Sequence, residues 1–175
     1  MRRWPAPLAS RVELSLPPAS ASALKNALKL TEGYVPGCFG RVAQTHAEYY
    51  SAQAGFGVNF EAKVAQELAA FCTRFQAVRD GLWLARGAQA CIAIDGSQAE
   101  SSGAHLRWFI ASETVRGTGV GKQLLQRALA FCRASGCGKV QLWTFAGLSA
   151  ARHLYESLGT QWGTLVQEQR FELVL

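Results

Sequence analysis

The chain has 175 residues, of which 49% are apolar and 17% charged, a composition that suits one globular domain and excludes a disordered chain. Its 18 Lys and Arg outnumber its 12 Asp and Glu, and the net charge of +6 favours an anionic ligand without naming it. No apolar stretch reaches the length of a transmembrane helix, and no cysteines are spaced as CxxC. We therefore expect a cytoplasmic protein with reduced thiols, no metal site and no membrane partner.

The first 32 residues hold four of the five prolines and a Ser/Ala-rich tract. We interpret residues 1–32 as an arm, partly flexible or helical, with a short helix over about 22–30, and residues 33–175 as the main domain. The stretch 37–53 is expected to begin as a strand and to continue as a helix. Apolar residues then recur at helical spacing from Phe60 and predict a second helix that ends before the Asp80–Gly81 turn.

The rest of the chain alternates short apolar runs with one Gly-rich loop. Arg86 and Gly87 separate the runs 82–85 and 88–94, which predicts an antiparallel hairpin. Further expected elements are, in order, a strand at 105–111, a helix at 120–135, a strand at 139–145, a helix at 149–158 and a strand at 171–175. Because a strand–helix–strand crossover is right-handed, strands 105–111 and 139–145 should be parallel. The expected fold is a mixed α/β sheet with helices on both sides.

The most informative motif is the run from Arg116 to Gly121, which lies between an expected strand and an expected helix. Its glycines, Gly117, Gly119 and Gly121, remove side chains where a ligand must approach the backbone closely. The helix behind them offers unpaired N–H groups and the positive end of its dipole, which together suit a diphosphate. Arg116 and Lys122 add positive charge at the two ends of the loop.

Three other interpretations of this loop compete with that one. A dinucleotide-binding fold requires GxGxxG, whereas the third glycine here comes one residue early. A P-loop requires GxxxxGK followed by Ser or Thr, whereas Gly121–Lys122 is followed by Gln123. A tight Gly-rich turn without a ligand remains the simplest alternative when the loop is taken alone.

The wider sequence context resembles the GCN5-related N-acetyltransferase (GNAT) family. The pattern Arg-x-x-Gly-x-Gly at Arg116, Gly119 and Gly121 is similar to the acyl-CoA signature of that family, and Leu124–Leu125 continues it into the helix. The run from Ala151 to Gly159 is similar to the family's A-x-x-L-Y-x-x-x-G helix. The stretches 37–71 and 142–159 particularly resemble acetyltransferase domains fused to MarR-type regulators, although no winged-helix domain is present in this sequence.

The resemblance implies a fold, a co-substrate and its binding residues. The sheet should be mostly antiparallel with a central splayed parallel pair, and acetyl-CoA should bind without a metal. The implied acetyl-CoA contacts comprise backbone groups of the strand, the loop amides, and two residues further on: Phe109, Ile110, Ala111, Arg116, Gly117, Thr118, Gly119, Val120, Gly121, Lys122, Ser149 and Tyr155.

The resemblance also implies a mechanism in which an acetyl group passes directly to a primary amine through a tetrahedral intermediate. Tyr155 would protonate the departing thiolate, since a phenol with a pKa of about 10 stays protonated at neutral pH, and the backbone N–H of Ile110 would stabilise the oxyanion. His105 or Glu113 is a candidate base, and Glu100 is a third, but ordered water could replace a dedicated base. Phe145 and Thr160 depart from the Asn and aromatic residue that the family commonly has at these places.

Two other function classes remain open at this point. A non-catalytic acyl-CoA-binding regulatory domain would keep the loop without turnover, and a nucleic-acid binder is suggested by charge alone. The basic residues at the N-terminus are too sparse for a nucleic-acid arm, so no nucleic-acid partner is expected. The amine acceptor, whether a small molecule, a peptide or a protein lysine, is not named by the sequence, and homodimerisation, common in the family, is left open.

Overall fold

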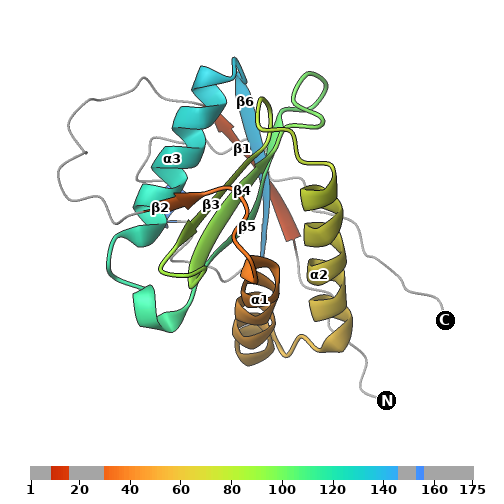
Figure 1. The fold of residues 1–175 in the computed structure, drawn as a ribbon, viewed down its shortest axis with the longest axis vertical. Coiled ribbons are helices and arrows are strands. Elements are labelled where there is room, and N and C mark those ends of the chain that lie inside the picture. The colour runs from red at the N-terminus through yellow and green to blue at the C-terminus, as the bar shows by residue number, and fades with distance from the viewer. Residues whose placement is uncertain (1–8, 16–29, 146–152, 156–175) are drawn as a thin grey trace.

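The computed structural model describes residues 9–15, 30–145 and 153–155, and within them six strands form a single sheet in the order β1-β6-β5-β4-β3-β2 (Figure 1). The strands are β1 (Ala9–Ser15), β2 (Leu30–Glu32), β3 (Gly81–Ala85), β4 (Ala90–Asp95), β5 (Ala104–Ala111) and β6 (Lys139–Phe145). The helices are α1 (Cys38–Ala54), α2 (Val58–Thr73) and α3 (Val120–Ala134), with a 3₁₀ turn η1 at Glu113–Val115. The expected mixed α/β fold is confirmed.

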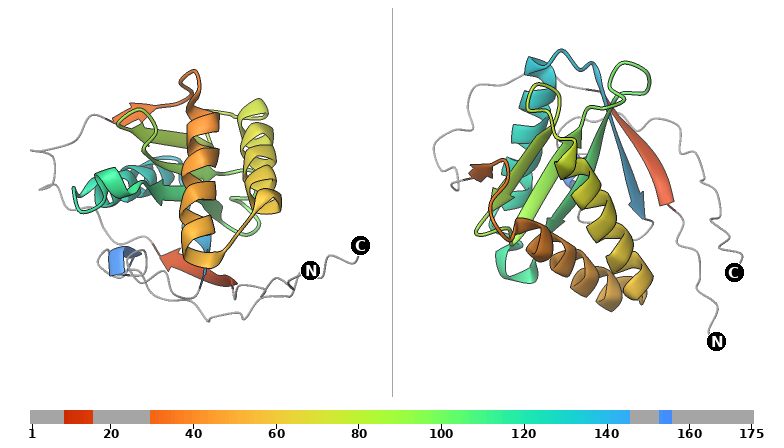
Figure 2. Two further views of the ribbon diagram at one scale, coloured as in Figure 1. Left: turned by 90° about the horizontal axis from the view of Figure 1, so that it is seen from below. Right: turned by 45° about the vertical axis from the view of Figure 1, so that its right-hand side comes forward.

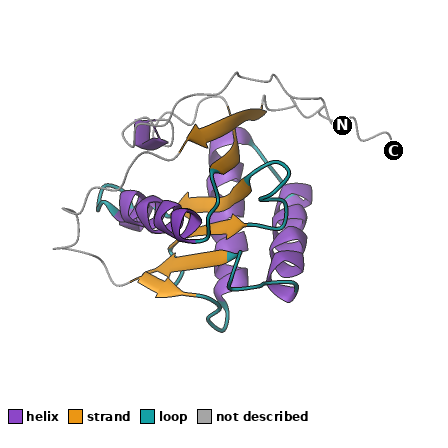
Figure 3. Ribbon diagram, turned by 90° about the horizontal axis from the view of Figure 1, so that it is seen from above, coloured by secondary structure: helices purple, strands orange, loops and turns teal. Residues whose placement is uncertain are grey.

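Helices cover both faces of the sheet, as expected. Figures 1 and 2 show α1 and α2 together on one face and α3 on the other, and Figure 3 shows the strands between them. Two separate apolar clusters fill the two interfaces, one beneath α3 and one beneath α1 and α2. On β3, Trp83 faces the α3 cluster, whereas Leu82 and Leu84 face the α1/α2 cluster. Burial on both faces explains why β3 and β4 appear in the sequence as continuous apolar runs.

The central strands splay apart, and this opening determines where a ligand can enter. β5 and β6 are parallel, but their pairing covers only Ala104–Leu106 against Val140–Leu142 within the described residues. Beyond this point β6 continues along β1, while β5 continues along β4 as far as Ala111. The backbone edges of β5 and β6 therefore face each other across a gap after Leu106.

A β-bulge turns β5 over at the start of that gap. The register with β4 shifts between Cys91 and Ala93, and Trp108 adopts the left-handed conformation with φ of 47°. Leu106 faces the α3 cluster before the bulge, whereas Trp108 and Ile110 face the α1/α2 cluster after it. One extra residue in a strand reverses the face of the sheet toward which the following side chains point. The bulge therefore lets side chains from the two halves of β5 pack against the clusters on both faces of the sheet.

One expectation for the periphery is wrong, and others fall partly or wholly outside the described residues. The strand expected at the beginning of 37–53 is wrong, because Gly37 with φ of 81° starts a helix at Cys38 without any preceding strand residue in that stretch. Within the region interpreted as an arm, β1 pairs antiparallel with β6 and β2 with β3. The expected strand at 171–175 and most of the expected helices at 22–30 and 149–158 lie outside the described residues, although residues 153–155 are helical.

Candidate functional site

The Gly-rich loop lies at one end of the sheet, in an exposed position at the beginning of α3. Residues 116–119 are exposed, while the two valines that bracket them, Val115 and Val120, are buried. The Thr118 hydroxyl donates a hydrogen bond to the Val115 carbonyl (2.7 Å) and fixes the turn. The loop is therefore anchored at both ends and presents its backbone to solvent at the N-terminus of a 15-residue helix.

Two of the three glycines are required by backbone conformation. Gly117 has φ of 74° and Gly119, the N-cap of α3, has φ of 81°, which L-residues rarely adopt. A Cβ at either position would meet no atom within 4 Å, so the space in front of them is open. The backbone can therefore be approached closely at these two residues, and the first-turn amides lack helical partners, as an anion cradle requires.

Gly121 is packed against protein side chains. A Cβ there would lie 3.3 Å from Leu154 Cδ2 and 3.6 Å from Phe109 Cζ, so this glycine makes room for protein side chains. The expected contact of Gly121 with acetyl-CoA stays a prediction and concerns its backbone amide. Its absent side chain instead lets the first turn of α3 approach Phe109 and the segment that carries Tyr155.

Arg116 is directed back along the sheet rather than out from the loop. Its Nε donates to the Ala111 carbonyl (3.0 Å), and its guanidinium lies 4.3 Å from the centroid of the Tyr49 ring. The contact ties the loop to α1 and to the last residue of β5. Lys122, on the first turn of α3, is exposed. Sequence reasoning did not identify Tyr49 as a neighbour of the loop, because no local pattern links a helix residue to a loop so distant in the chain.

The backbone of β5 alternates between the two neighbouring strands. Ser112 N donates to Gln89 O (2.8 Å), and the register continues through the pairs Ala90–Ala111 and Cys91–Ile110. Hydrogen-bonded and non-hydrogen-bonded pairs alternate in an antiparallel ladder, so the N–H and C=O of Ala111 point away from β4, into the gap. The contact from Arg116 to the Ala111 carbonyl agrees with this direction.

Tyr155 is brought next to the strand, as expected for a residue of the site. Its side chain is buried, and its ring centroid lies 6.1 Å from that of Phe109. Burial, assisted by the neighbouring Tyr50 phenol, raises the pKa of Tyr155 well above its ordinary value. Burial also raises the pKa of Tyr50 to about 12. Both phenols therefore hold their protons at neutral pH, and the closeness of Tyr50 was not evident from the sequence.

The candidate bases are not brought together. His105 lies at the start of β5, half-buried, with its ring 6.4 Å from that of Trp143. Glu113 is exposed in η1, beside the loop at the opposite end of β5, and Glu100 is exposed in the β4–β5 connection. Ser149, expected to contact acetyl-CoA, lies outside the described residues.

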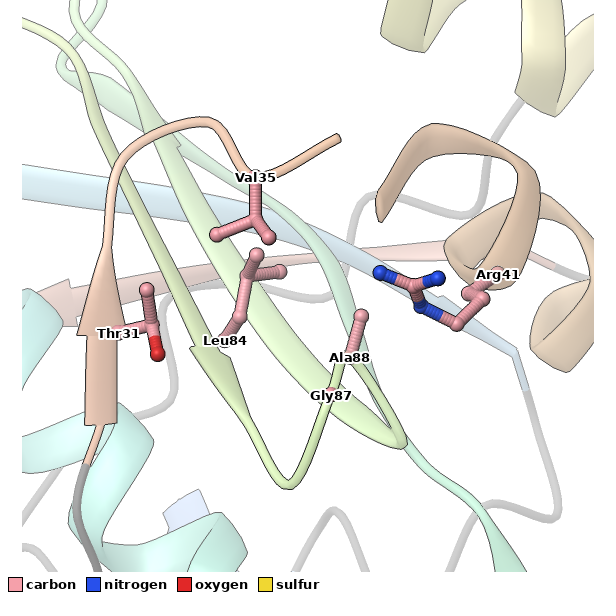
Figure 4. Close-up of a pocket in the computed structure, with 6 residues that line it drawn as sticks. All are labelled: Thr31, Val35, Arg41, Leu84, Gly87 and Ala88. Atoms are coloured by element: carbon pink, nitrogen blue, oxygen red, sulfur yellow. The ribbon is translucent and has the colours of Figure 1, made fainter. Parts of the chain in front are cut away.

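Neither of two hollows among the described residues coincides with the loop. One of about 260 Å³ lies at the end of the sheet that holds the β4–β5 connection, lined by Arg74, Asp95, Ser97, Gln98, His105 and Arg107. The other, of about 40 Å³, is lined by Thr31, Val35, Arg41, Leu84, Gly87 and Ala88 (Figure 4). The smaller one has room for little more than a water molecule.

Within the described residues, no cluster of three or more His, Cys, Asp or Glu side chains is arranged to bind a metal. The helices in the same part of the chain are too short or too polar to cross a membrane.

Comparison with solved structures finds the same fold in several bacterial proteins. An acetyltransferase from Streptococcus agalactiae superposes with a TM-score of 0.62 at 19% identity, over 84% of this chain and 90% of that one. A putative acetyltransferase from Bacillus subtilis gives 0.60 at 20% identity, over 82% and 99%. A predicted acetyltransferase from Clostridium acetobutylicum, solved with acetyl-CoA, gives 0.60 at 14% identity, over 83% and 96%.

Comparison at the level of sequence is consistent with the structural likeness. No curated protein matches this sequence. The sequence model of the acetyltransferase (GNAT) family, however, matches residues 33–160, a range that contains the splayed strands, the loop and Tyr155. The chain therefore belongs to the acetyltransferase (GNAT) family.

Proposed function

We propose that the protein is an N-acetyltransferase that moves an acetyl group from acetyl-CoA directly to a primary amine through a tetrahedral intermediate. One observation carries the proposal: an exposed turn with two left-handed glycines begins α3 at the end of β5, immediately beside the gap between β5 and β6. This arrangement supports the proposal, because an anion site at the turn would lie in line with an open strand edge, as a ligand with a diphosphate and an amide-containing arm requires.

The residues present fit acetyl-CoA as a substrate. The amides of the loop and of the first turn of α3 would hold the diphosphate, with Lys122 supplying charge from its exposed position. The strand edge would hold the pantetheine arm through backbone groups. The proposed contacts are those of the strand, the loop and the later segment: Phe109, Ile110, Ala111, Arg116, Gly117, Thr118, Gly119, Val120, Gly121, Lys122, Ser149 and Tyr155.

The alternation of hydrogen-bonded and non-hydrogen-bonded pairs between β4 and β5 bears on the proposed oxyanion donor. Ile110 pairs with Cys91 one step from the Ala90–Ala111 pair, so its N–H points toward β4. Ala111 presents its N–H to the gap instead, and its carbonyl keeps a second lone pair beside the bond from Arg116. We therefore assign the N–H of Ala111, which lies beside the loop, to the pantetheine arm, and we no longer favour the N–H of Ile110 as the oxyanion donor.

Proton transfer needs an acid for the thiolate and a route for the amine proton. Tyr155 suits the acid, because burial raises its pKa and keeps the phenol protonated while Phe109 holds it beside β5. Of the candidate bases, His105 lies on the strand itself, one residue before the last pair that joins β5 to β6. Glu113 is exposed beside the loop, so His105 is the better candidate.

The decisive experiment compares turnover with binding in Tyr155→Phe. If Tyr155 is the acid, release of CoA across an amine panel should fall by about 10²-fold or more while calorimetric affinity for acetyl-CoA is kept. Tyr34→Phe is the matched control, since Tyr34 is 62% exposed and follows β2, which is distant from β5 in the sheet order. If wild-type protein binds acetyl-CoA but never releases CoA, the non-catalytic acyl-CoA-binding domain is the correct alternative.

Four further features remain predictions. These are the cytoplasmic location, homodimerisation, the absence of a metal from the reaction, and the particular likeness to domains fused to MarR-type regulators. Fractionation of cells, sedimentation of the purified protein, and turnover after treatment with a chelator would test the first three directly.

A further inference from the structure

The larger hollow lies where an acceptor would have to approach. His105 and Arg107 flank Leu106, the last residue of β5 that pairs with β6, so the hollow adjoins the closed end of the gap. The Gly-rich loop lies beyond the other end of β5, as Figure 1 shows for the start of α3 and the β4–β5 connection. A ligand in the hollow would therefore face the acetyl end of a substrate whose diphosphate sits on the loop.

The lining of the hollow has more hydrogen-bond donors than acceptors. It contains two guanidinium groups and one carboxylate, that of Asp95. Asp95 is buried and already accepts bonds from Arg74 Nη1 (3.1 Å), from Arg74 Nη2, and from the Ser97 N–H (3.1 Å) and hydroxyl (2.7 Å). These bonds outweigh the opposing effect of burial and lower the pKa of Asp95 to about 2. Asp95 therefore stays ionised and has little capacity left for an ammonium group.

The two arginines are held in place and keep unused donors. The guanidinium of Arg107 lies 4.2 Å from the Trp108 ring centroid and bonds to Glu67, while its contact to Asp95 is longer, at 3.8 Å. Arg74 lies 5.6 Å from the Phe71 ring centroid, and its side chain is 38% exposed. Each guanidinium has five N–H donors, so both retain donors beyond those that their carboxylate partners use. Asp95 occupies the end-on fork of Arg74 through Nη1 and Nη2, so a ligand carboxylate would bond to the remaining N–H groups of the two guanidiniums.

From this arrangement we infer that the hollow binds the carboxylate of the acceptor, and that the acceptor is a small amine that carries a carboxylate, such as an amino acid. The inference rests on the proposed function and specifies its substrate class. A volume of about 260 Å³ lies just below the range of small-molecule sites and suits a metabolite-sized amine. In the proposed reaction the amine nitrogen bonds to the acetyl carbon, the C–S bond breaks, and the amine proton leaves as the thiolate is protonated.

The test measures CoA release with matched acceptors: common L-amino acids, the corresponding carboxamides and the corresponding decarboxylated amines. Amino acids should give a kcat/KM at least about tenfold above that of their carboxamides, as expected for one charge-assisted hydrogen bond. Arg74→Gln should raise KM for amino acids about tenfold, with kcat kept and with no change for carboxamides. Arg74→Lys keeps an ion pair with Asp95 but removes the fork, so it should fold normally and still lose the preference.

Arg79→Gln is the matched control, because Arg79 is a neighbouring arginine that pairs with Asp80 and does not line the hollow. The inference would be overturned if the wild type gave equal kcat/KM for amino acids and carboxamides. It would also be overturned if Arg74→Gln and Arg74→Lys lowered kcat/KM equally for the two classes of acceptor. Either result would leave the acetyltransferase proposal intact. Calorimetry with N-acetyl amino acids tests whether the hollow binds a carboxylate even when no amine is acetylated. Binding that depends on Arg74 without CoA release from any amine would keep the carboxylate site and reject the acetyltransferase.

Discussion

Replacing Gly119 by alanine tests the proposed diphosphate site most directly. The residue caps α3 with φ of 81° and ψ of 0°, and a Cβ there would meet no atom within 4 Å, so the substitution adds backbone strain without a clash. A left-handed L-residue costs about 1–2 kcal/mol. For a domain of this size, each kcal/mol of lost stability lowers Tm by about 2–4 °C.

The effect on ligand binding should be larger than the effect on stability. A strained turn can relax only by leaving the left-handed region, which turns at least one loop amide away from the anion. Loss of one hydrogen bond to a charged group costs about 1.5–3 kcal/mol, or about 10- to 150-fold in Kd. Calorimetric titration with acetyl-CoA measures this loss, and thermal denaturation without ligand measures the strain.

Gly33→Ala provides a control with the same strain at a distant place. Gly33 has φ of 82°, an added Cβ there would also meet no atom within 4 Å, and the residue follows β2 at the far edge of the sheet. Both variants should lose similar stability, and only Gly119→Ala should lose affinity for acetyl-CoA. If Gly119→Ala were destabilised like Gly33→Ala but bound acetyl-CoA as the wild type does, the loop would not be the diphosphate site.

Three other outcomes are expected. Burial lowers the pKa of His46 to about 4, so the unfolded chain, with a pKa near 6.5, takes up the proton first as pH falls. The contribution of this group to stability is full above pH 6.5 and falls toward pH 4. In urea unfolding, the wild type should therefore lose about 2 kcal/mol more of its free energy of unfolding between pH 7 and 5 than His46→Gln does. Parallel pH profiles of the free energy of unfolding for the two proteins would contradict this. In Gly96→Ala a Cβ would lie 2.2 Å from the Arg79 carbonyl oxygen, so we expect a lower urea midpoint than for Gly119→Ala, and an equal midpoint would refute the clash. A double-mutant cycle of Arg116→Gln and Tyr49→Leu should give a coupling of about 0.5–1 kcal/mol, and additive losses would show that the ring contact contributes nothing.

Much of the fold was predictable because its signals are local. Short apolar runs separated by turn residues predicted the β3–β4 hairpin, and the bounds of β6 were predicted without error at Lys139 and Phe145. The handedness of a strand–helix–strand unit predicted that β5 and β6 are parallel, which the structure confirms. The Arg-x-x-Gly-x-Gly pattern located the loop, whose conformation is set by residues adjacent in the chain.

The strand expected before α1 was wrong because its local signal was ambiguous, since a stretch of apolar and aromatic residues suits both a strand and a buried helix face. Val42 and Ala43 are indeed buried in the α1/α2 cluster, and tertiary packing decided between the two. The pairing of β1 with β6 was also hidden from sequence, because it joins segments more than 120 residues apart.

The sequence by itself determined the family, the order of most elements and the loop at the start of α3, because each depends on neighbouring residues and on motifs with fixed spacing. Only the tertiary structure decided that Gly121 accommodates Leu154, that Arg116 contacts Ala111 and Tyr49, and that Tyr155 lies beside Phe109. It also decided that Arg74, Asp95 and Arg107 meet at one hollow. Contacts of this kind join side chains from different elements, and their geometry is set by the bulge and splay of β5, which no local pattern specifies.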